Sequence, residues 1–214
     1  RGSGQGENPG TNTVILGRGT DKRKLIEIGS GSDWNDKIAN SKSDIISEFI
    51  PAGSRSFEVE DISAYNVGDN IIIYHPSTQK WIDAVDKGAT NGDVDWLPGE
   101  IDMYFNRIIT HIDGNKIKVD VPIFDHLDRT LSQSCIWIVD RSNLLSHTGI
   151  ENLRVDIQTT TSPEDENHPW DCIYFSGVED SWVKDVTTRH FAKSGSRLFK
   201  SSHCTILDCT AINP

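Results

Sequence analysis

The sequence predicts an all-β protein, a parallel β-solenoid interrupted by a small antiparallel β module. Three observations indicate this fold: a repeat near the C-terminus, short β-like runs separated by small and polar residues, and a central segment that lacks this rhythm. In a parallel solenoid each repeat forms one turn, and its strands pair with the next turn about 4.8 Å away. One turn cannot bury its own inner face, so we expect the turns to stack.

The repeat is clearest between residues 172–186 (CIYFSGVEDSWVKDV) and 195–209 (GSRLFKSSHCTILDC). A shift of 23 positions places Phe175 on Leu198, and other apolar positions mostly fall on apolar ones. A period in the low twenties with short strands is typical of one solenoid turn. We therefore expect Phe175 and Leu198 to lie side by side in one interior. Chance similarity within an ordinary β-sandwich is the alternative.

A second alignment extends the coil backwards. Residues 134–139 (SCIWIV) match residues 171–176 (DCIYFS) at a shift of 37, with residues 159–170 as a loop that accounts for the extra length. This alignment places Cys135 beside Cys172 on adjacent parallel strands. Either a disulfide or a pair of free thiols acting as small hydrophobic groups fits that position.

A third alignment adds one more turn. The run IENLRVDI matches DSWVKDVT at a shift of 30, which places Leu153 beside Val183. Asp185 recurs as Asp208 in the 23-residue repeat. A recurring Asp usually caps a corner by accepting backbone N–H bonds, so we expect a structural role for both.

The rhythm of the repeat is lost in the middle of the chain. Asp113-Gly114-Asn115 is a strong hairpin signal between two β-like runs, and the polar stretch 77–105 is expected to be a loop. The predicted organisation is residues 1–42 as the first coils, 43–130 as the inserted antiparallel module, and 131–214 as further coils. Neither end shows a clear cap, so we expect a fragment of a longer protein.

The composition restricts the partners and the compartment. The chain has 214 residues and a formal net charge of −11 without a basic stripe, so nucleic acid is not an expected partner. It has no run of about 18 apolar residues, so we expect no membrane span. Turns rich in small polar residues, six Trp and a single Met are typical of a secreted, extracellular all-β protein.

Four stretches resemble secreted pectate-lyase-like proteins. They are RGSGQGENPGTNTVILG (1–17), IPAGSRSFEVEDISAYNVGDNIII (50–73), RIITHIDGNKIKVDVPI (107–123) and ENHPWDCIYFSGVEDSWVKDVTTRHF (166–191). The resemblance covers most of the chain and implies a right-handed parallel β-helix. That superfamily includes polysaccharide lyases, glycoside hydrolases, tailspike-like depolymerases and proteins with no known reaction. The resemblance is therefore specific for the fold and only weakly specific for the activity.

Candidate sugar-binding residues lie on the outer face that a β-helix offers to a glycan chain. The alignments place Trp137, Tyr174 and Arg197 in one outward column. Aromatic rings stack on sugar faces, and a guanidinium binds a carboxylate or sulfate bidentately. Trp170 and Arg189 are further substrate-binding candidates. The alternative is an aromatic ladder that only stabilises the sheet by cross-strand packing.

An acidic loop, SPEDENHPWD, offers a possible metal site. Glu164, Glu166 and Asp171 are candidate ligands for Ca²⁺, because carboxylate oxygens suit a hard cation. Such an ion would neutralise a uronate carboxylate during β-elimination. His168, which stands between acids and Trp170, is a candidate for proton transfer. The alternative is a solvated acidic loop.

The segment TRHFAKSGSR is the densest basic stretch of an acidic chain, which indicates a bound anion. In lyases of this fold class the base is often Arg or Lys. The resemblance implies His190, Lys193 or Arg197 as catalytic residues, with His168 opposite. The alternative is surface charges that pair with the acidic loop. The remaining histidines occur singly and are expected to be structural: His75, His111, His126, His147 and His203.

The leading interpretation is a secreted carbohydrate-active protein that binds a polysaccharide and cleaves it by β-elimination or hydrolysis. Its cofactor is not specified by the sequence, with Ca²⁺ as the candidate. The competing interpretation is a non-catalytic extracellular adhesin, matrix or filament subunit, for which self-association through the ends of the coil would serve. Convergence of His168, His190 and Arg197 on one groove would favour the enzyme.

Overall fold

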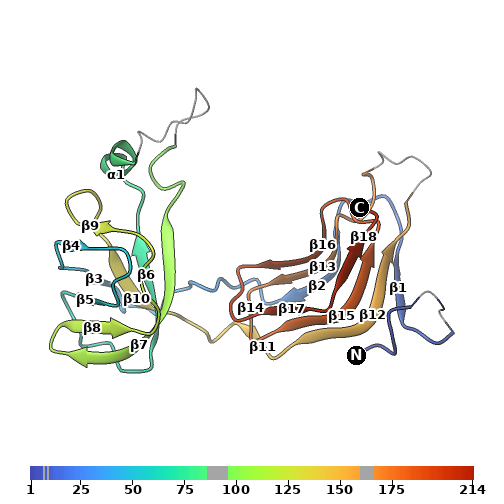
Figure 1. Ribbon diagram of the computed structural model, residues 1–214, viewed down its shortest axis with the longest axis horizontal. Coiled ribbons are helices and arrows are strands. Elements are labelled where there is room, and N and C mark those ends of the chain that lie inside the picture. The colour runs from blue at the N-terminus through green and yellow to red at the C-terminus, as the bar shows by residue number, and fades with distance from the viewer. Residues whose placement is uncertain (7, 9, 86–95, 160–165) are drawn as a thin grey trace. The chain divides into compact units, whose positions relative to one another are not determined.

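The chain forms two compact units (Figure 1). The computed structural model describes residues 1–214 apart from residues 7, 9, 86–95 and 160–165. We call the unit formed by residues 1–34 and 141–214 the coil, and the unit formed by residues 35–140 the module. The module is thus an insertion in the chain of the coil.

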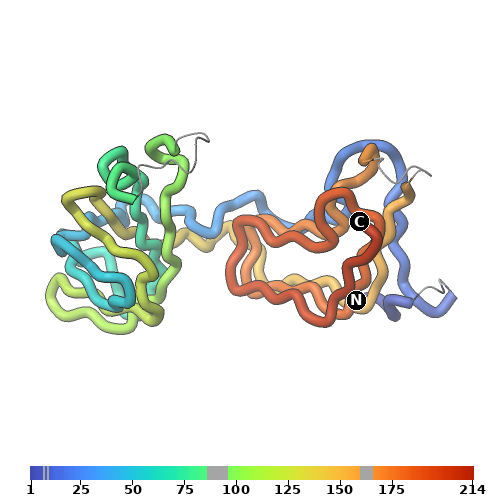
Figure 2. The backbone as a smooth tube through the Cα atoms, turned by 45° about the horizontal axis from the view of Figure 1, so that its top comes forward, coloured from blue at the N-terminus to red at the C-terminus, as the bar shows by residue number. Residues whose placement is uncertain are grey.

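The coil is built from strands of successive turns, which Figure 2 shows stacked on one another from orange to red. They are β1 (Val14–Gly17), β2 (Lys24–Gly29), β11 (Leu145–Ser146), β12 (Gly149–Ile157), β13 (Asp171–Ser176), β14 (Val178–Glu179), β15 (Trp182–Arg189), β16 (Ser194–Phe199), β17 (Thr205–Leu207) and β18 (Thr210–Ile212). The described strands form three parallel sheets: β1–β12–β15–β17 with β18 also on β15, β16–β13–β2, and β11–β14. This arrangement confirms the predicted all-β parallel β-helix with an inserted antiparallel module.

The predicted 23-residue repeat is the register of the last turns. Phe175 pairs with Leu198, and Val183 pairs with Ile206 in the neighbouring sheet. Phe175 and Val183 are fully buried, because each turn covers the inner face of the one before it. The side chains of Phe175 and Leu198 belong to one hydrophobic core, as predicted.

The third alignment paired the right strands in the wrong register. β12 and β15 are neighbours, but Leu153 pairs with Val186, a shift of 33 rather than 30. The corner explains the difference. Asn152 has a left-handed backbone (φ 55°), and the residues at the same corner of the next two turns, Asp185 and Asp208, share it (φ 52° and 51°). Asn and Asp adopt this conformation more readily than most residues, so the corner fixes the register.

The second alignment is wrong. β10 (Cys135–Ile138) belongs to the module, where it pairs antiparallel with β6 (Asn70–His75) and β3 (Ser43–Asp44). Cys135 therefore does not lie on a strand beside Cys172, and all four cysteines are free thiols. A short apolar run such as CIWI suits any buried central strand, so its sequence does not distinguish the two units. The inserted unit is accordingly wider than the expected 43–130.

The module contains an antiparallel sheet with the order β3–β10–β6–β7–β8–β5 and a second, two-stranded antiparallel sheet. Its remaining elements are β4 (Phe49–Ile50), β5 (Ser56–Glu58), the helix α1 (Gln79–Ala84), β7 (Met103–Asp113), β8 (Lys116–Val119) and β9 (Leu127–Asp128). The predicted hairpin is confirmed as β7–β8, with Gly114 in a left-handed conformation (φ 55°) at its turn. The stretch expected to be a loop contains α1. No helix in the described part of the chain is long and apolar enough to cross a membrane.

Burial of His75 is expected to make the chain sensitive to acid. Its side chain is fully buried, Nδ1 lies 2.7 Å from the Ser134 hydroxyl, and burial lowers the pKa of its imidazole. The unfolded chain has an ordinary histidine pKa of about 6.5 and therefore binds this proton more readily than the folded chain. The stability contributed by neutral His75 is fully present above about pH 6.5 and is lost as the pH falls towards the lowered pKa.

We expect the free energy of unfolding, measured by urea denaturation, to fall between about pH 7.5 and pH 5.5. His75→Asn keeps a polar group near Ser134 but does not titrate. This variant should show a smaller fall over the same interval, whatever its stability at neutral pH. Identical pH dependence of the two proteins would contradict a role of His75.

Candidate functional site

The sheet β16–β13–β2 carries the side chains of the candidate site on its outer face. Phe175 pairs with Leu198, and both side chains face the core of the coil. One position earlier, Tyr174 pairs with Arg197 on one side and Glu27 on the other. Because successive side chains of a strand point to opposite faces, Glu27, Tyr174 and Arg197 form a column on the outer face. The repeat in the sequence predicted that Tyr174 and Arg197 lie side by side, and the pairing of β13 with β16 confirms it.

Backbone hydrogen bonds stack the corner that precedes this sheet. The N–H of Trp170 donates to the carbonyl of Arg23 (2.8 Å), and the N–H of Lys193 donates to the carbonyl of Trp170 (2.9 Å). Arg23, Trp170 and Lys193 therefore occupy equivalent places in successive turns. The ammonium groups of Lys22 and Lys193 lie 5.3 and 5.4 Å from the centroid of the Trp170 ring.

The corner and the adjacent sheet together form an open depression of about 430 Å³, which we call the cationic depression. Its lining combines five basic side chains with two carboxylates and one indole: Lys22, Arg23, Lys24, Lys193 and Arg197, then Glu27 and Asp171, and finally Trp170. A concentration of positive charge in a chain of net charge −11 is a property of this place rather than of the whole protein.

Tyr174 holds two of these cations in place. Its side chain is only 5% exposed, so its ring is not available to stack on a sugar. The Lys24 ammonium lies 4.0 Å and the Arg197 guanidinium 5.3 Å from the ring centroid. Phe199 stacks on the same ring at 6.1 Å and lies 5.2 Å from the Arg197 guanidinium. Cation–π contacts of this kind fix the direction of both charged groups.

The two carboxylates of the depression already have partners. Glu27 accepts a hydrogen bond of 2.6 Å from Lys24, which raises the pKa of Lys24 and keeps it charged. Asp171 is 3% exposed and accepts a hydrogen bond from the Ser194 hydroxyl. Neither carboxylate lies within ion-pair distance of Lys22, Lys193 or Arg197.

Four of the five cations have no acidic partner in the described part of the chain, and of these Arg23 donates a hydrogen bond to the backbone carbonyl of Arg18 (3.0 Å). No described carboxylate lies within ion-pair distance of Lys22, Lys193 or Arg197. Their known contacts are with the aromatic rings of Trp170, Tyr174 and Phe199. The depression therefore presents charge that an anionic ligand would neutralise.

The two predicted catalytic histidines do not line the cationic depression. His190 lies at a corner of the coil (φ 58°), and its Nδ1 is 2.7 Å from the Asp156 carboxylate. His168 is 6% exposed, and its Nδ1 lies 3.0 Å from the carbonyl of the adjacent Pro169. Of the three residues expected to converge on one groove, only Arg197 lines this one.

Two predicted substrate-binding residues also lie elsewhere. Arg189 ends β15 in the neighbouring sheet, where it pairs with Asp156 and Ile212. Trp137 lies on β10 of the module, so the expected column of Trp137, Tyr174 and Arg197 does not exist. The error follows from the wrong alignment of residues 134–139.

The candidate calcium ligands that the structure describes, Glu166 and Asp171, do not belong to a metal-binding group. Glu164 lies outside the described residues. Glu166 is exposed, whereas Asp171 is buried and bonded to Ser194. No group of three or more His, Cys, Asp or Glu residues that could hold a metal ion occurs among the described residues. The described side chains alone do not form a calcium site, and we derive no step through such an ion.

Sequence reasoning missed the contribution of β2 to the site. Lys24 and Glu27 reach the depression because β2 pairs with β13, although the module separates them in the chain. A signal was present: KLIEIG (24–29) and DCIYFS (171–176) share a polar residue followed by apolar alternation and a small residue. The separation of the two runs exceeds any plausible turn length, which hid the match.

No protein-family model and no curated protein sequence matches the chain. Similar solved structures include the Gp54 tailspike of Acinetobacter baumannii bacteriophage AP22 in complex with A. baumannii capsular saccharide (TM-score 0.36, 9% identity, 92% of this chain and 45% of the tailspike). The tailspike gp49 of Pseudomonas phage LKA1 (0.39, 9%, 97% and 42%) and the tailspike gp61 of Pseudomonas phage phi297 (0.38, 11%, 94% and 39%) are also similar. The chain spans less than half the length of each.

Proposed function

We propose that the coil binds an acidic extracellular polysaccharide at the cationic depression. The observation that carries this proposal is the presence of three cations, Lys22, Lys193 and Arg197, without a described acidic partner beside partly exposed Trp170. The guanidinium of Arg197 suits bidentate binding of a carboxylate or sulfate, and the lysines act as point charges. The indole of Trp170 is the ring that a sugar can approach.

The negative net charge of the chain does not oppose this proposal. Charges further apart than a Debye length of about 8 Å are largely screened at physiological ionic strength. The cations line one depression and would lie beside a glycan bound there, whereas most of the acidic side chains lie outside its lining. Local charge therefore determines binding, and we expect the affinity to fall as salt is added.

Cleavage of the bound glycan is a second proposal, and β-elimination suits the lining better than hydrolysis does. Hydrolysis uses a pair of carboxyl groups, one as acid and one as base or nucleophile. Glu27 and Asp171 are both engaged by Lys24 and Ser194. In β-elimination Arg197 would neutralise the uronate carboxylate, and Lys193, after it has released a proton to solvent, would remove the proton from C5. The C4–O glycosidic bond would break as the C4=C5 double bond forms, and the leaving oxygen would take a proton from the Lys193 ammonium or from water.

Replacing Arg197 by glutamine is expected to weaken binding of polygalacturonate about tenfold, because a charged hydrogen-bonding group is lost. Calorimetry at two salt concentrations measures the affinity, and ultraviolet absorbance of an unsaturated product reports elimination in the same samples. Lys184→Gln, on β15 of the neighbouring sheet, is the matched control for charge. Equal losses in the two variants, or none in Arg197→Gln, would overturn the proposal.

A further inference from the structure

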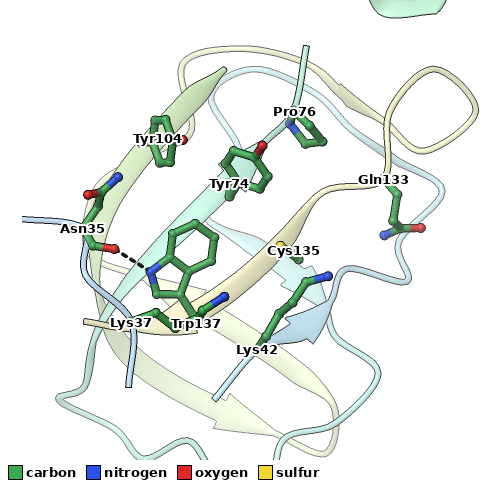
Figure 3. Close-up of a pocket in the computed structure, with 9 residues that line it drawn as sticks. All are labelled: Asn35, Lys37, Lys42, Tyr74, Pro76, Tyr104, Gln133, Cys135 and Trp137. Carbon is green, nitrogen blue, oxygen red and sulfur yellow. Dashed lines mark hydrogen bonds between the residues drawn. The ribbon is translucent and has the colours of Figure 1, made fainter. Parts of the chain in front are cut away.

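The module contains a second pocket, of about 530 Å³, within the size range of ligand sites in proteins (Figure 3). Its lining includes three aromatic residues, two lysines and a glutamine: Tyr74, Tyr104, Trp137, Lys37, Lys42 and Gln133. We call it the aromatic pocket. It lies wholly on residues of the module, so it is a different site from the cationic depression.

Three adjacent strands supply the aromatic wall. Tyr74 on β6 pairs with Tyr104 on β7, and Trp137 lies on β10, on the other side of β6. The ring centroid of Tyr74 lies 5.1 Å from that of Tyr104 and 5.5 Å from that of Trp137. Residues on one face of neighbouring strands contact in this way, and the result is a continuous apolar surface. Trp137 is only 8% exposed and backs the wall, so its accessible part is offered by Tyr104, at 38% exposed, and by half-buried Tyr74.

The polar ends of two of these rings are already bonded, which fixes the wall. The indole N–H of Trp137 donates to the carbonyl of Asn35 at 2.9 Å, the dashed bond of Figure 3. The hydroxyl of Tyr74 donates to the Asp102 carboxylate at 2.6 Å. A ligand therefore meets preorganised ring surfaces and loses little free energy in ordering them.

Two lysine ammonium groups add positive charge beside the aromatic wall. The Lys37 ammonium lies 5.4 Å from the Trp137 ring centroid and has no acidic partner among the described residues. Lys42 lies 3.3 Å from Asp44, an exposed pair that a ligand can share. No carboxylate occurs among the described residues that line the pocket.

Gln133 adds an oriented hydrogen-bond acceptor. Its Nε2 donates to the carbonyls of Ile45 (2.9 Å) and Ser134 (2.8 Å), which fixes the orientation of the amide. Its Oε1 has no hydrogen-bond partner in the described part of the chain. This oxygen can accept a hydrogen bond from a hydroxyl group of a ligand.

We propose that the aromatic pocket binds one acidic sugar residue of the hexuronate type. The apolar face of the sugar ring lies on the aromatic wall, the carboxylate points towards Lys37 and Lys42, and a hydroxyl donates to Gln133. This assignment rests on the proposed function for the choice of an acidic glycan and adds a second binding site in the other unit. A small aromatic acid has a flat face and a carboxylate, as the sugar does. It lacks the hydroxyl groups that would donate hydrogen bonds to Gln133.

The test is calorimetry on the full chain with oligogalacturonate, a neutral cello-oligosaccharide and benzoate. We expect two oligogalacturonate sites per chain and weak or no binding of the other two compounds. Lys37→Gln, a substitution of an exposed residue that does not threaten folding, should weaken one site about tenfold. Tyr104→Ala should weaken the same site, whereas Tyr104→Phe should retain it. Lys80→Gln, on the exposed face of α1, is the control for charge.

The outcomes separate this inference from the proposed function. Weakening of one site by Lys37→Gln and of the other site by Arg197→Gln supports both. A site that survives Arg197→Gln but not Lys37→Gln supports the aromatic pocket even where the coil does not bind. A wild-type chain with one site that only Arg197→Gln removes overturns the inference. Equal binding of the neutral oligosaccharide, or of benzoate in competition with the sugar, overturns the assignment to an acidic sugar.

Discussion

Replacing Phe175 by alanine is expected to lower the free energy of unfolding by about 3–5 kcal/mol. Phe175 is fully buried on β13, the central strand of its sheet, and pairs with Ile28 and Leu198 in the turns on either side. Removal of the ring leaves a cavity that two neighbouring turns border. Urea denaturation measures the loss, and hydrogen exchange of the β13 amides locates it in the coil.

Phe199→Ala is the matched control, because the same residue type lies on the neighbouring strand but is 39% exposed. Its loss of stability should stay below about 1 kcal/mol, since little apolar surface is removed from a core. Phe175→Leu should fall between the two variants. Equal losses for Phe175→Ala and Phe199→Ala would show that Phe175 does not occupy the interior of stacked turns.

The repeat was predictable because stacking imposes it on the sequence. Every turn must place apolar residues at the same points of the cross-section, so Phe175 and Leu198 carry the same constraint. The corners impose a second constraint, which the sequence reasoning recognised only for Asp185 and Asp208. His147, Asp180 and His203 share a left-handed backbone at one corner (φ 54°, 46° and 52°). Alignment of such corner residues gives the correct shift of 33 from His147 to Asp180.

The position of β10 was not predictable from its own residues. Cys135, Ile136 and Trp137 are all buried, as a central strand of either unit requires. Which sheet takes this strand depends on its partners, β3 and β6, and those contacts span more than 60 residues of chain. The same limit hid the aromatic pocket, because its wall forms only when β6, β7 and β10 are adjacent.

The residues of the candidate site that belong to the 23-residue repeat were predictable from the sequence. Those that precede the inserted module in the chain were not. Trp170, Lys193 and Arg197 belong to the two turns that the repeat aligned, and they line one depression. Lys24 joins them only through β2. His190 was expected at the site because it lies in the same basic segment, but the left-handed corner directs its chain elsewhere, and its ring meets Asp156.

Pairing of β2 with β13 therefore connects the stability of the coil to the candidate site, and Gly29 is where that pairing is most vulnerable. Gly29 has φ 148°, and a Cβ on this residue would lie 1.7 Å from the carbonyl oxygen of Ser176. No adjustment of a flexible side chain relieves a clash with backbone. We expect Gly29→Ala to lower the free energy of unfolding by about 2–4 kcal/mol, measured by urea denaturation, through strain and overpacking together.

Gly31→Ala is the control that measures backbone strain without a steric clash. Gly31 also has a positive φ (79°), but a Cβ there meets no atom within 4 Å, so its cost should be about 1 kcal/mol. Because β2 carries Lys24 and Glu27 into the cationic depression, Gly29→Ala should also weaken binding of polygalacturonate under conditions where the variant remains folded. Gly31→Ala should leave that affinity unchanged. Equal stability of the two variants would mean that β2 does not lie against β13 at Ser176, and the depression would then lack one of its walls.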